Sequence, residues 1–156
     1  MNKYQNWTEE NIQKIELLET YADMKEIALQ MLKNLPQPVV QLCGPLTTGG
    51  RGSFEANIEM FNEGIQFLAK QDKTIFDQRP FEIPMQKLKA VRKDSGYAYE
   101  LLNEFYLPIF ESGYVKELYF LPGWENSVGA CWEHEQAQRL EITISYLPKD
   151  LLGHKK

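Results

Sequence analysis

Residues 39–61 have the sequence VVQLCGPLTTGGRGSFEANIEMF, and this segment predicts the architecture. Val39–Cys43 is a short apolar run that starts with two β-branched residues, which is typical of a buried strand. The loop Gly44–Gly52 holds four glycines, and Ser53 then caps a predicted helix. The inward stripe of that helix consists of Ile58, Phe61, Ile65 and Leu68. A buried strand, a glycine-rich loop and a helix in this order predict one unit of a parallel sheet.

Further strands and helices alternate along the rest of the chain. The predicted strands are Thr74–Phe76, Val115–Leu121 and Ile142–Ile144. The predicted helices are a segment with Leu88 and Val91 that ends near Ser95-Gly96, Tyr97–Tyr106, which Pro108 stops or kinks, and Val128–Leu140. This alternation predicts an α/β fold, a Rossmann-like parallel sheet with helices on both faces.

The chain before this sheet is predicted to be helical. Thr8 can cap a first helix, and Leu35–Pro38 ends the helical segment, as one bent helix or as two. The sequence therefore divides into an N-terminal helical extension (1–36), an α/β domain (37–147) and a polar tail (148–156).

Composition restricts the classes of function. With 156 residues and 18.2 kDa, the chain has the length of one ordinary domain. The net charge of −5 and the pI near 5.1 argue against DNA or RNA as a polymer partner, since such a partner needs a basic face. A mononucleotide is compatible with this charge, because backbone N–H groups alone can bind one phosphate.

Cysteine, histidine and apolar content predict no cofactor, no metal and no membrane partner. Cys43 and Cys131 are too few for a disulfide scaffold, and no Cys/His cluster has zinc spacing. No apolar run approaches the ~18 residues of a membrane span, and the polar N-terminus has no signal core. We expect a reduced, cytoplasmic protein.

Two predicted loops, Gly44–Ser53 and Pro122–Ser127, follow strands and precede helices. Ligands of parallel sheets bind beyond the carboxyl ends of the strands, so these loops are expected to line one cleft. The first loop offers backbone N–H groups, a helix start and Arg51 to an anion, although a turn with positive φ angles explains it equally well. In the second loop, Trp124 is either a lid on the core or a plate on which a flat ligand stacks.

One carboxylate of the last predicted helix faces inward, because it shares a helical face with three apolar residues. The members of that face are Ala130, Glu133, Ala137 and Leu140. Such a carboxylate is either bonded to free N–H groups of a neighbouring loop or acts as a nucleophile or base. Ser127, six residues before Glu133, is predicted to cap the helix and can also donate to an anion. We interpret His134 and Cys131 as packing residues rather than a catalytic pair.

These residues resemble a known family. The segment LPGWENSVGACWEHEQAQRL (Leu121–Leu140) resembles a motif of the nucleoside 2-deoxyribosyltransferase-like superfamily, closest to a small uncharacterised bacterial and phage branch with the pattern L-P-G-W-x-x-S-x-G-A-x-x-E-x-x-x-A. The segment CGPLTTGGRGSFEANIEMF (Cys43–Phe61) is similar to the first loop and helix of that family. It is also similar to the glycine-rich loop of 2′-deoxynucleoside 5′-monophosphate N-glycosidases. The resemblance covers Val39 to Ile144.

The resemblance implies a flavodoxin-like sheet, a dimer and a nucleoside or nucleotide as the small-molecule partner. It implies that Glu133 is the nucleophile that takes the deoxyribosyl group and that Ser127 binds the 5′-phosphate. The expected substrate-binding residues, taken from both loops, are Gly44, Gly49, Gly50, Arg51, Trp124, Asn126 and Ser127.

The sequence departs from the family pattern where other catalytic groups are expected. Gln41 stands where a tyrosine often orients the nucleophile, and Pro45 stands where the N-glycosidases have serine. An aspartate that acts on the leaving base is expected near Pro108 and Ile109, and another aspartate is expected at Lys116. Glu104 or Glu111, from the neighbouring helix, are the candidates to replace that acid.

Two main functions and one weaker alternative agree with these features. The first is an N-glycosidase or transferase that uses Glu133, and the second is a nucleotide-binding module without turnover, in line with the missing aspartate. The third is a purely structural dimer of the same fold. Self-association is also expected from the aromatic residues of Tyr97–Phe110, which we predict to be exposed.

Overall fold

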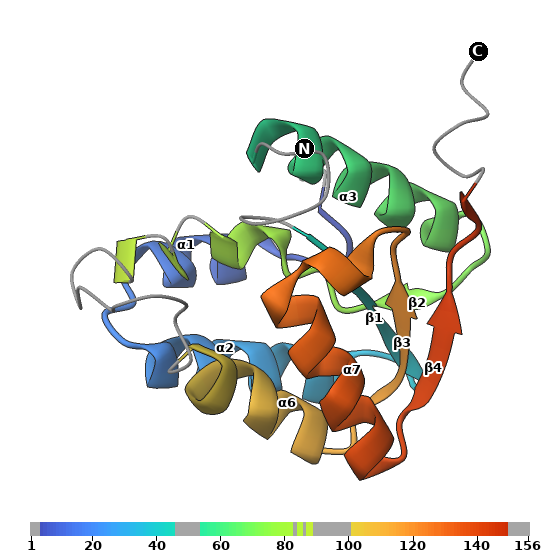
Figure 1. The fold of residues 1–156 in the computed structure, drawn as a ribbon. Coiled ribbons are helices and arrows are strands. Elements are labelled where there is room, and N and C mark those ends of the chain that lie inside the picture. The colour runs from blue at the N-terminus through green and yellow to red at the C-terminus, as the bar shows by residue number, and fades with distance from the viewer. Residues whose placement is uncertain (1–3, 46–53, 83, 86, 89–100, 150–156) are drawn as a thin grey trace.

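The computed structural model describes residues 4–45, 54–82, 84–85, 87–88 and 101–149. Within these residues, four strands form one parallel sheet in the order β2-β1-β3-β4 (Figure 1). The strands are β1 (Val39–Cys43), β2 (Thr74–Ile75), β3 (Val115–Phe120) and β4 (Thr143–Tyr146). This is the strand order of a flavodoxin-like sheet, so the predicted α/β fold is confirmed.

The carboxyl ends of β1 and β3 lie side by side. Cys43 is in register with Phe120, and the Leu121 N–H donates to the Cys43 carbonyl at 2.9 Å. The chain order reverses between these two strands, because β2 lies on one side of β1 and β3 on the other. Ligands of doubly wound sheets bind at such a reversal point.

Helices cover both faces of the sheet, as predicted (Figure 1). Helix α3 (Phe54–Ala69) covers one face, where Phe61, Ile65 and Leu68 pack with Leu42 of β1. Ile58, also predicted to face inward, is half-buried. The other face is covered by α1 (Glu9–Glu16), α2 (Tyr21–Asn34), α6 (Leu107–Glu111) and α7 (Val128–Leu140). The predicted cap Ser53 and residues 89–96 of a predicted helix lie outside the described residues.

Side chains of β1 alternate between these two faces. Val40 and Leu42 point to α3, whereas Val39 and Cys43 belong to the core on the α7 side. Gln41 therefore lies on the α7 side of the sheet, fully buried between two apolar neighbours.

The N-terminal segment forms two helices, which answers the question that the sequence left open. Thr8 caps α1 by accepting from the Asn11 N–H at 3.1 Å, and Thr20 caps α2 by accepting from the Asp23 N–H at 3.0 Å. The buried side chains of these helices belong to the same core cluster as those of α7.

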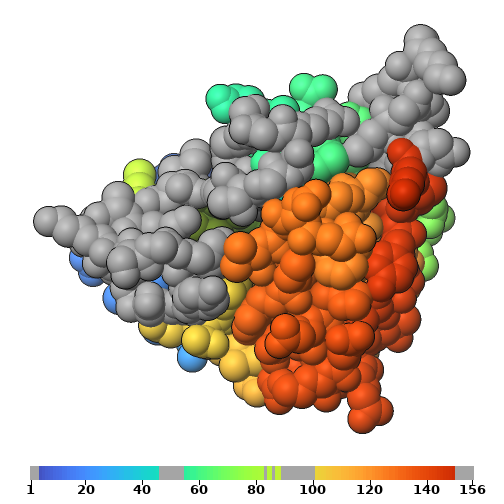
Figure 2. Space-filling model, viewed as in Figure 1, coloured from blue at the N-terminus to red at the C-terminus, as the bar shows by residue number. Residues whose placement is uncertain are grey.

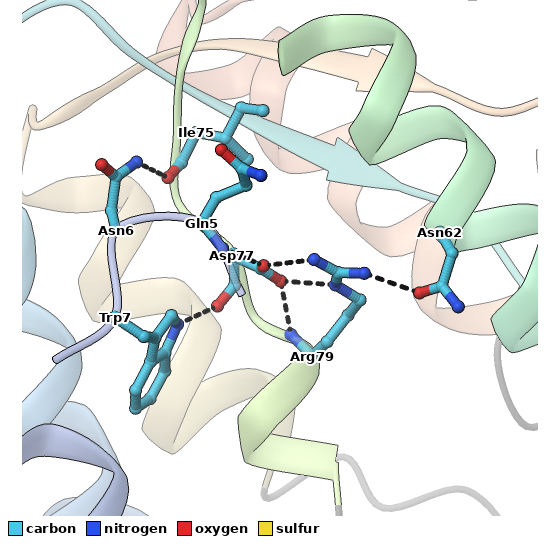
Figure 3. A network of polar contacts seen from close by, with 7 residues as sticks. All are labelled: Gln5, Asn6, Trp7, Asn62, Ile75, Asp77 and Arg79. Atoms are coloured by element: carbon cyan, nitrogen blue, oxygen red, sulfur yellow. Dashed lines mark hydrogen bonds and ion pairs between the residues drawn. The ribbon is translucent and has the colours of Figure 1, made fainter. Parts of the chain in front are cut away.

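Residues before α1 cover the open edge of β2 (Figure 3). The Gln5 N–H donates to the Asp77 carboxylate at 2.8 Å, and the Trp7 indole N–H donates to the Asp77 carbonyl at 2.6 Å. The Asn6 side chain donates to the Ile75 carbonyl at 3.0 Å. Since an edge strand exposes unpaired backbone groups, these contacts protect the sheet on this side.

Of the two predicted effects of Pro108, the structure excludes an end of the helix. The chain makes a π-helical turn over Leu102–Tyr106 and continues as α6 to Glu111, so Pro108 does not end the helix. The Leu107 N–H donates to the carbonyl of Leu102, five residues earlier. A hydrogen bond across five residues defines a π turn, which here directly precedes the proline.

The prediction that the aromatic side chains of Tyr97–Phe110 are exposed is wrong for residues 101–110, the part of this segment that the structure describes. Phe105, Tyr106 and Phe110 are buried in the core of the chain itself, because α2 and α7 pack on either side of them. They provide no surface for self-association, so the homodimer stays a prediction without this support. None of the helices in the described part of the chain combines the length and apolar character needed to cross a bilayer.

Candidate functional site

Buried polar side chains gather toward one edge of the sheet. Among the described residues, the buried polar or charged side chains are Gln41, Asn57, Asp77, Gln78, Glu82, Ser127 and Glu133. Gln41 lies within β1. Every other residue of this set follows β1, β2 or β3 in the chain and lies either in the loop after the strand or in the first two turns of the next helix. The carboxyl edge of a parallel sheet is where ligands bind, so this edge is the candidate site.

Glu133 lies on the inner side of α7, as the helical spacing predicts. Ala130, Glu133 and Ala137 are buried in a row that faces the sheet, and Leu140 is half-buried. Ser127 caps α7, as predicted, because its Oγ accepts from the Ala130 N–H at 3.2 Å. The hydroxyl hydrogen of Ser127 remains a donor for a ligand at the helix start.

Two side chains of β1 bond the Glu133 carboxylate. Gln41 Nε2 donates to Glu133 Oε2 at 3.3 Å, and the Cys43 thiol also donates to the Glu133 carboxylate. Both partners come from the strand that precedes the first predicted loop. Gln41 thus holds Glu133 in place by a hydrogen bond. The family that the sequence resembles often has tyrosine at this strand position.

The surroundings of Glu133 disfavour its charge. Burial raises the pKa of Glu133 from its ordinary value of 4.5 to about 8, because water no longer solvates the ionised carboxylate. The hydrogen bond from Cys43 opposes this shift, and the charge of Glu82 adds to it. Burial, followed by the charge of Glu133, raises the pKa of the Cys43 thiol well above its usual range. At neutral pH Glu133 is therefore mostly protonated, and a perturbed carboxyl in such a place is typical of a functional site.

Sequence reasoning missed Glu82 and Gln78, which come from the proline-bearing region after β2. Gln78 Nε2 donates to the Leu42 carbonyl at 3.1 Å and so extends the hydrogen-bond pattern of β1 by a side chain. Glu82 is 6 % exposed and follows a 3₁₀ turn, Arg79–Phe81. Gln78 lies two residues after Phe76 and Glu82 directly follows Phe81, but these polar positions have no helical or strand period that would show them to be buried.

The two predicted loops start beside each other. A Cβ built on Gly44 would lie 2.6 Å from Leu121 Cδ1 and 3.0 Å from Leu121 Cβ, so a larger residue would displace the Leu121 side chain at this contact between the ends of β1 and β3. The placement of both loops at one edge is confirmed for these first residues. Gly49, Gly50 and Arg51 lie outside the described residues, and a cleft shared by both loops stays a prediction.

Trp124 packs on the outer flank of α7. Its ring stacks on His134 at 4.3 Å with an angle of 12° between the planes, and it also contacts Phe120 and Tyr146. Trp124, Tyr146 and Lys149 line a hollow of about 310 Å³ beyond β3 and β4. Figure 2 shows the residues of α7 and β4 (orange to red) as one continuous face of the molecule. The partners of Trp124 thus come from β3, α7 and β4, whereas those of Glu133 come from β1.

The remaining predicted residues take different positions. Asn126 is exposed at the end of the second loop. His134 bonds the Tyr146 hydroxyl at 2.7 Å, whereas the Cys131 thiol donates to the Glu125 carbonyl at 3.3 Å, so the two side chains have separate partners. This agrees with their interpretation as packing residues.

The helix that was expected to supply an acid does not direct one at Glu133. Glu104 is exposed, and Glu111 is half exposed and pairs with Arg139 at 3.7 Å. Among the described residues, Glu82 is instead the carboxyl whose charge acts on Glu133.

The residues that the structure describes contain no group of three His, Cys, Asp or Glu side chains arranged to hold a metal ion. Comparison of the chain with protein-family models, with curated proteins and with solved structures gave no match. The flavodoxin-like fold and the site around Glu133 are therefore the basis for inferring function.

Proposed function

We propose that the protein cleaves or transfers the N-glycosidic bond of a nucleoside or nucleotide, with Glu133 as the nucleophile. The observation that carries this proposal is the buried Glu133 carboxyl, held by Gln41 at 3.3 Å and by the Cys43 thiol at the carboxyl edge of a parallel sheet. A carboxyl whose pKa burial raises to about 8, close to the edge of a sheet where ligands bind, is typical of a functional group, and this favours a chemical role.

The chemistry follows that of retaining glycosidases. The ionised Glu133 oxygen attacks C1′ of the sugar, the bond from C1′ to the base nitrogen breaks, and a glycosyl ester forms on Glu133. Water or a second base then takes the sugar and releases the Glu133 carboxylate. Positive charge that develops at C1′ stabilises the ionised carboxylate in the bound complex, which offsets the burial that raises the pKa of the free enzyme.

Substrate binding in this proposal uses the two strand-to-helix connections. The first turns of α3 and α7 lie after the carboxyl ends of β1 and β3, so their positive ends favour a phosphate or another anion. Ser127 adds a hydroxyl donor there. Gly49, Gly50 and Arg51 complete the proposed phosphate site, and a homodimer is proposed as the assembly.

A nucleotide-binding module without turnover is the second candidate. The raised pKa of Glu133 favours it, because a protonated carboxyl donates a hydrogen bond to a ligand but does not attack C1′. The two functions predict different results in one experiment.

That experiment is the incubation of the protein with 2′-deoxynucleosides and their 5′-monophosphates, followed by quantification of free base. Release by the wild type and its loss in Glu133→Gln supports the enzyme, because the substitution is nearly isosteric and removes only the ionisable oxygen. No release, together with protection of the wild type from thermal unfolding by a monophosphate, supports the binding module. Neither release nor protection contradicts both.

A further inference from the structure

Strand β4 forms one edge of the sheet and lies at the outside of the molecule (Figure 1). Within the described residues, β4 pairs with β3 alone. The opposite edge, β2, is covered by the residues before α1, where the Asn6 side chain bonds the Ile75 carbonyl. The two edges of the sheet therefore differ, because β4 presents its outer backbone groups to a further strand.

The hydrogen bonds to β3 show which backbone groups of β4 point outward. The Leu147 N–H donates to the Phe120 carbonyl at 3.0 Å, and Phe120 is in register with Tyr146. In a parallel pair with this register, the N–H and C=O groups of Ser145 and Leu147 are directed to β3. Since this direction alternates along a strand, the N–H and C=O groups of Ile144 and Tyr146 point away from the sheet.

The side chains of β4 favour pairing at this edge. Ile144 packs on the core on the α7 side, and Tyr146 stacks against Trp124 on the same side. Tyr146 is 57 % exposed and is one of three large hydrophobic side chains exposed among the described residues. Edge strands are commonly protected by lysine, proline or a bulge, and the sequence Thr-Ile-Ser-Tyr of β4 has none of these.

A second copy of the chain fits this edge in the antiparallel direction. A two-fold axis at Ser145 places Ile144 of each copy opposite Tyr146 of the partner subunit, so that outward backbone groups meet outward backbone groups. Each such pair exchanges two N–H···O bonds and brings a β-branched side chain beside an aromatic ring, which is a favourable cross-strand pair.

The two ends of β4 carry opposite charges. Exposed Glu141 precedes the strand, and exposed Lys149 follows it. Antiparallel pairing brings the acidic end of one strand beside the basic end of the other, whereas parallel pairing brings like charges together. Charge complementarity therefore favours the same arrangement as the backbone groups do.

We propose that two copies of the chain pair antiparallel along β4, about a two-fold axis at Ser145, and so join their sheets into one. This inference gives the proposed homodimer its interface. It rests on the proposed assembly and is independent of the proposed reaction, so each can fail alone. The interface borders the hollow that Trp124, Tyr146 and Lys149 line.

Sedimentation equilibrium tests the assembly. At high micromolar concentration the wild type should have twice the chain mass of 18.2 kDa. Tyr146→Lys should raise the dissociation constant by about tenfold or more, because a charge on an edge strand disfavours pairing. Tyr146→Phe is the matched control. It also loses the bond to His134 but should match the wild type. A monomeric wild type, or a Tyr146→Lys dimer as tight as the wild type, would overturn the interface.

Ser145→Cys tests the position of the two-fold axis. Facing residues of a non-hydrogen-bonded antiparallel pair have Cα atoms about 4.5 Å apart, a distance that a disulfide spans. Both thiol variants are made with Cys131→Ser, which removes the partly exposed native thiol. Mild oxidation should link most Ser145→Cys chains into dimers on a non-reducing gel, and far-UV circular dichroism checks that they are folded.

Thr143→Cys, on the same face of β4, is the control for this register. Its counterpart in the other copy lies four residues away along the strand, about 13 Å, so these chains should stay unlinked. Absence of the Ser145→Cys link, or equal linking of Thr143→Cys, would overturn the proposed pairing. Base release by a monomeric protein contradicts this interface alone, whereas a linked dimer that neither releases base nor binds a monophosphate contradicts the proposed function alone.

Discussion

Gln41 and Glu133 are 92 positions apart in sequence, yet Gln41 Nε2 lies 3.3 Å from Glu133 Oε2 in the core between β1 and α7. The amide is fully buried, and the carboxyl is 7 % exposed. A mid-strand glutamine on an apolar face thus has a defined partner, and a buried polar contact joins β1 to α7.

Glu133→Gln is expected to change how stability depends on pH. The pKa of Glu133 is about 8 in the folded protein and near 4.5 when unfolded, so between these values the folded state holds a proton that the unfolded state has released. The free energy of unfolding therefore falls as pH rises through this window, by up to about 5 kcal/mol for this group. Chemical denaturation of both proteins at pH 4.5, 6, 7 and 8 measures the difference. The extra slope should be present in the wild type and absent in Glu133→Gln, and parallel curves would contradict the prediction.

Gln41→Met is expected to raise the pKa of Glu133 further, because it removes a donor that stabilises the ionised carboxylate. A hydrogen bond to a charged group contributes about 1.5–3 kcal/mol, which corresponds to roughly one to two pKa units. A ¹³C NMR titration of the Glu133 carboxyl measures this shift directly. Gln138→Met makes the same change at an exposed position of α7 and should leave the titration unchanged. An unchanged midpoint in Gln41→Met would show that the amide does not stabilise the carboxylate.

Ser127→Ala is expected to destabilise the fold and to weaken phosphate binding. Loss of an N-cap costs about 1 kcal/mol, which lowers the melting temperature of a domain this size by about 2–4 °C. Thr20→Ala removes the cap of α2 and should have a similar effect on stability. Isothermal titration with a deoxynucleoside monophosphate then separates the two variants, because only Ser127→Ala should bind it more weakly, by about 1–3 kcal/mol. Equal affinities would limit Ser127 to its capping role.

Asp77→Ala is expected to be strongly destabilising. The buried Asp77 carboxylate bonds the Arg79 guanidinium at 2.6 and 2.8 Å and the Gln5 N–H at 2.8 Å, and Arg79 in turn donates to Asn62 at 2.7 Å (Figure 3). Removing one partner of a buried ion pair costs about 3–5 kcal/mol, since the other charge stays buried. Glu111→Ala breaks the exposed pair with Arg139 and should cost less than about 1 kcal/mol. Denaturant midpoints compare the two, and similar losses would refute this ranking.

The elements with clear periodicity could be predicted from the sequence. The strand Val39–Cys43 and the helix Val128–Leu140 were predicted to the residue, because an apolar run before Gly-Pro and an Ala/Glu face bounded by a serine cap are local signals. Glu133 was found for the same reason, since helical phase alone shows which side of α7 it faces.

The rest of the site depends on contacts between distant segments. Glu82 and Gln78 follow a two-residue strand in a region with no period. Gln78 reaches the end of β1 through the Leu42 carbonyl, and Phe81 packs on Trp7 and Phe105, contacts that no local pattern predicts. The sequence drew attention to Gln41 only because the resembled family often has tyrosine at this position. No local pattern shows that its amide reaches a helix far along the chain. The burial of Phe105 and Phe110 was likewise hidden, since it needs α2 and α7 on either side.

The most direct test of the central claim is the detection of a covalent glycosyl group on Glu133. The wild type and Glu133→Gln are incubated with a deoxynucleoside monophosphate whose sugar carries fluorine at C2′, because the fluorine slows release of the glycosyl enzyme more than its formation. Intact mass spectrometry and peptide mapping then follow. The account predicts one added sugar phosphate in the wild type, located on Glu133, and none in Glu133→Gln. An adduct on another residue, or an unmodified wild type that nevertheless releases base, would contradict it.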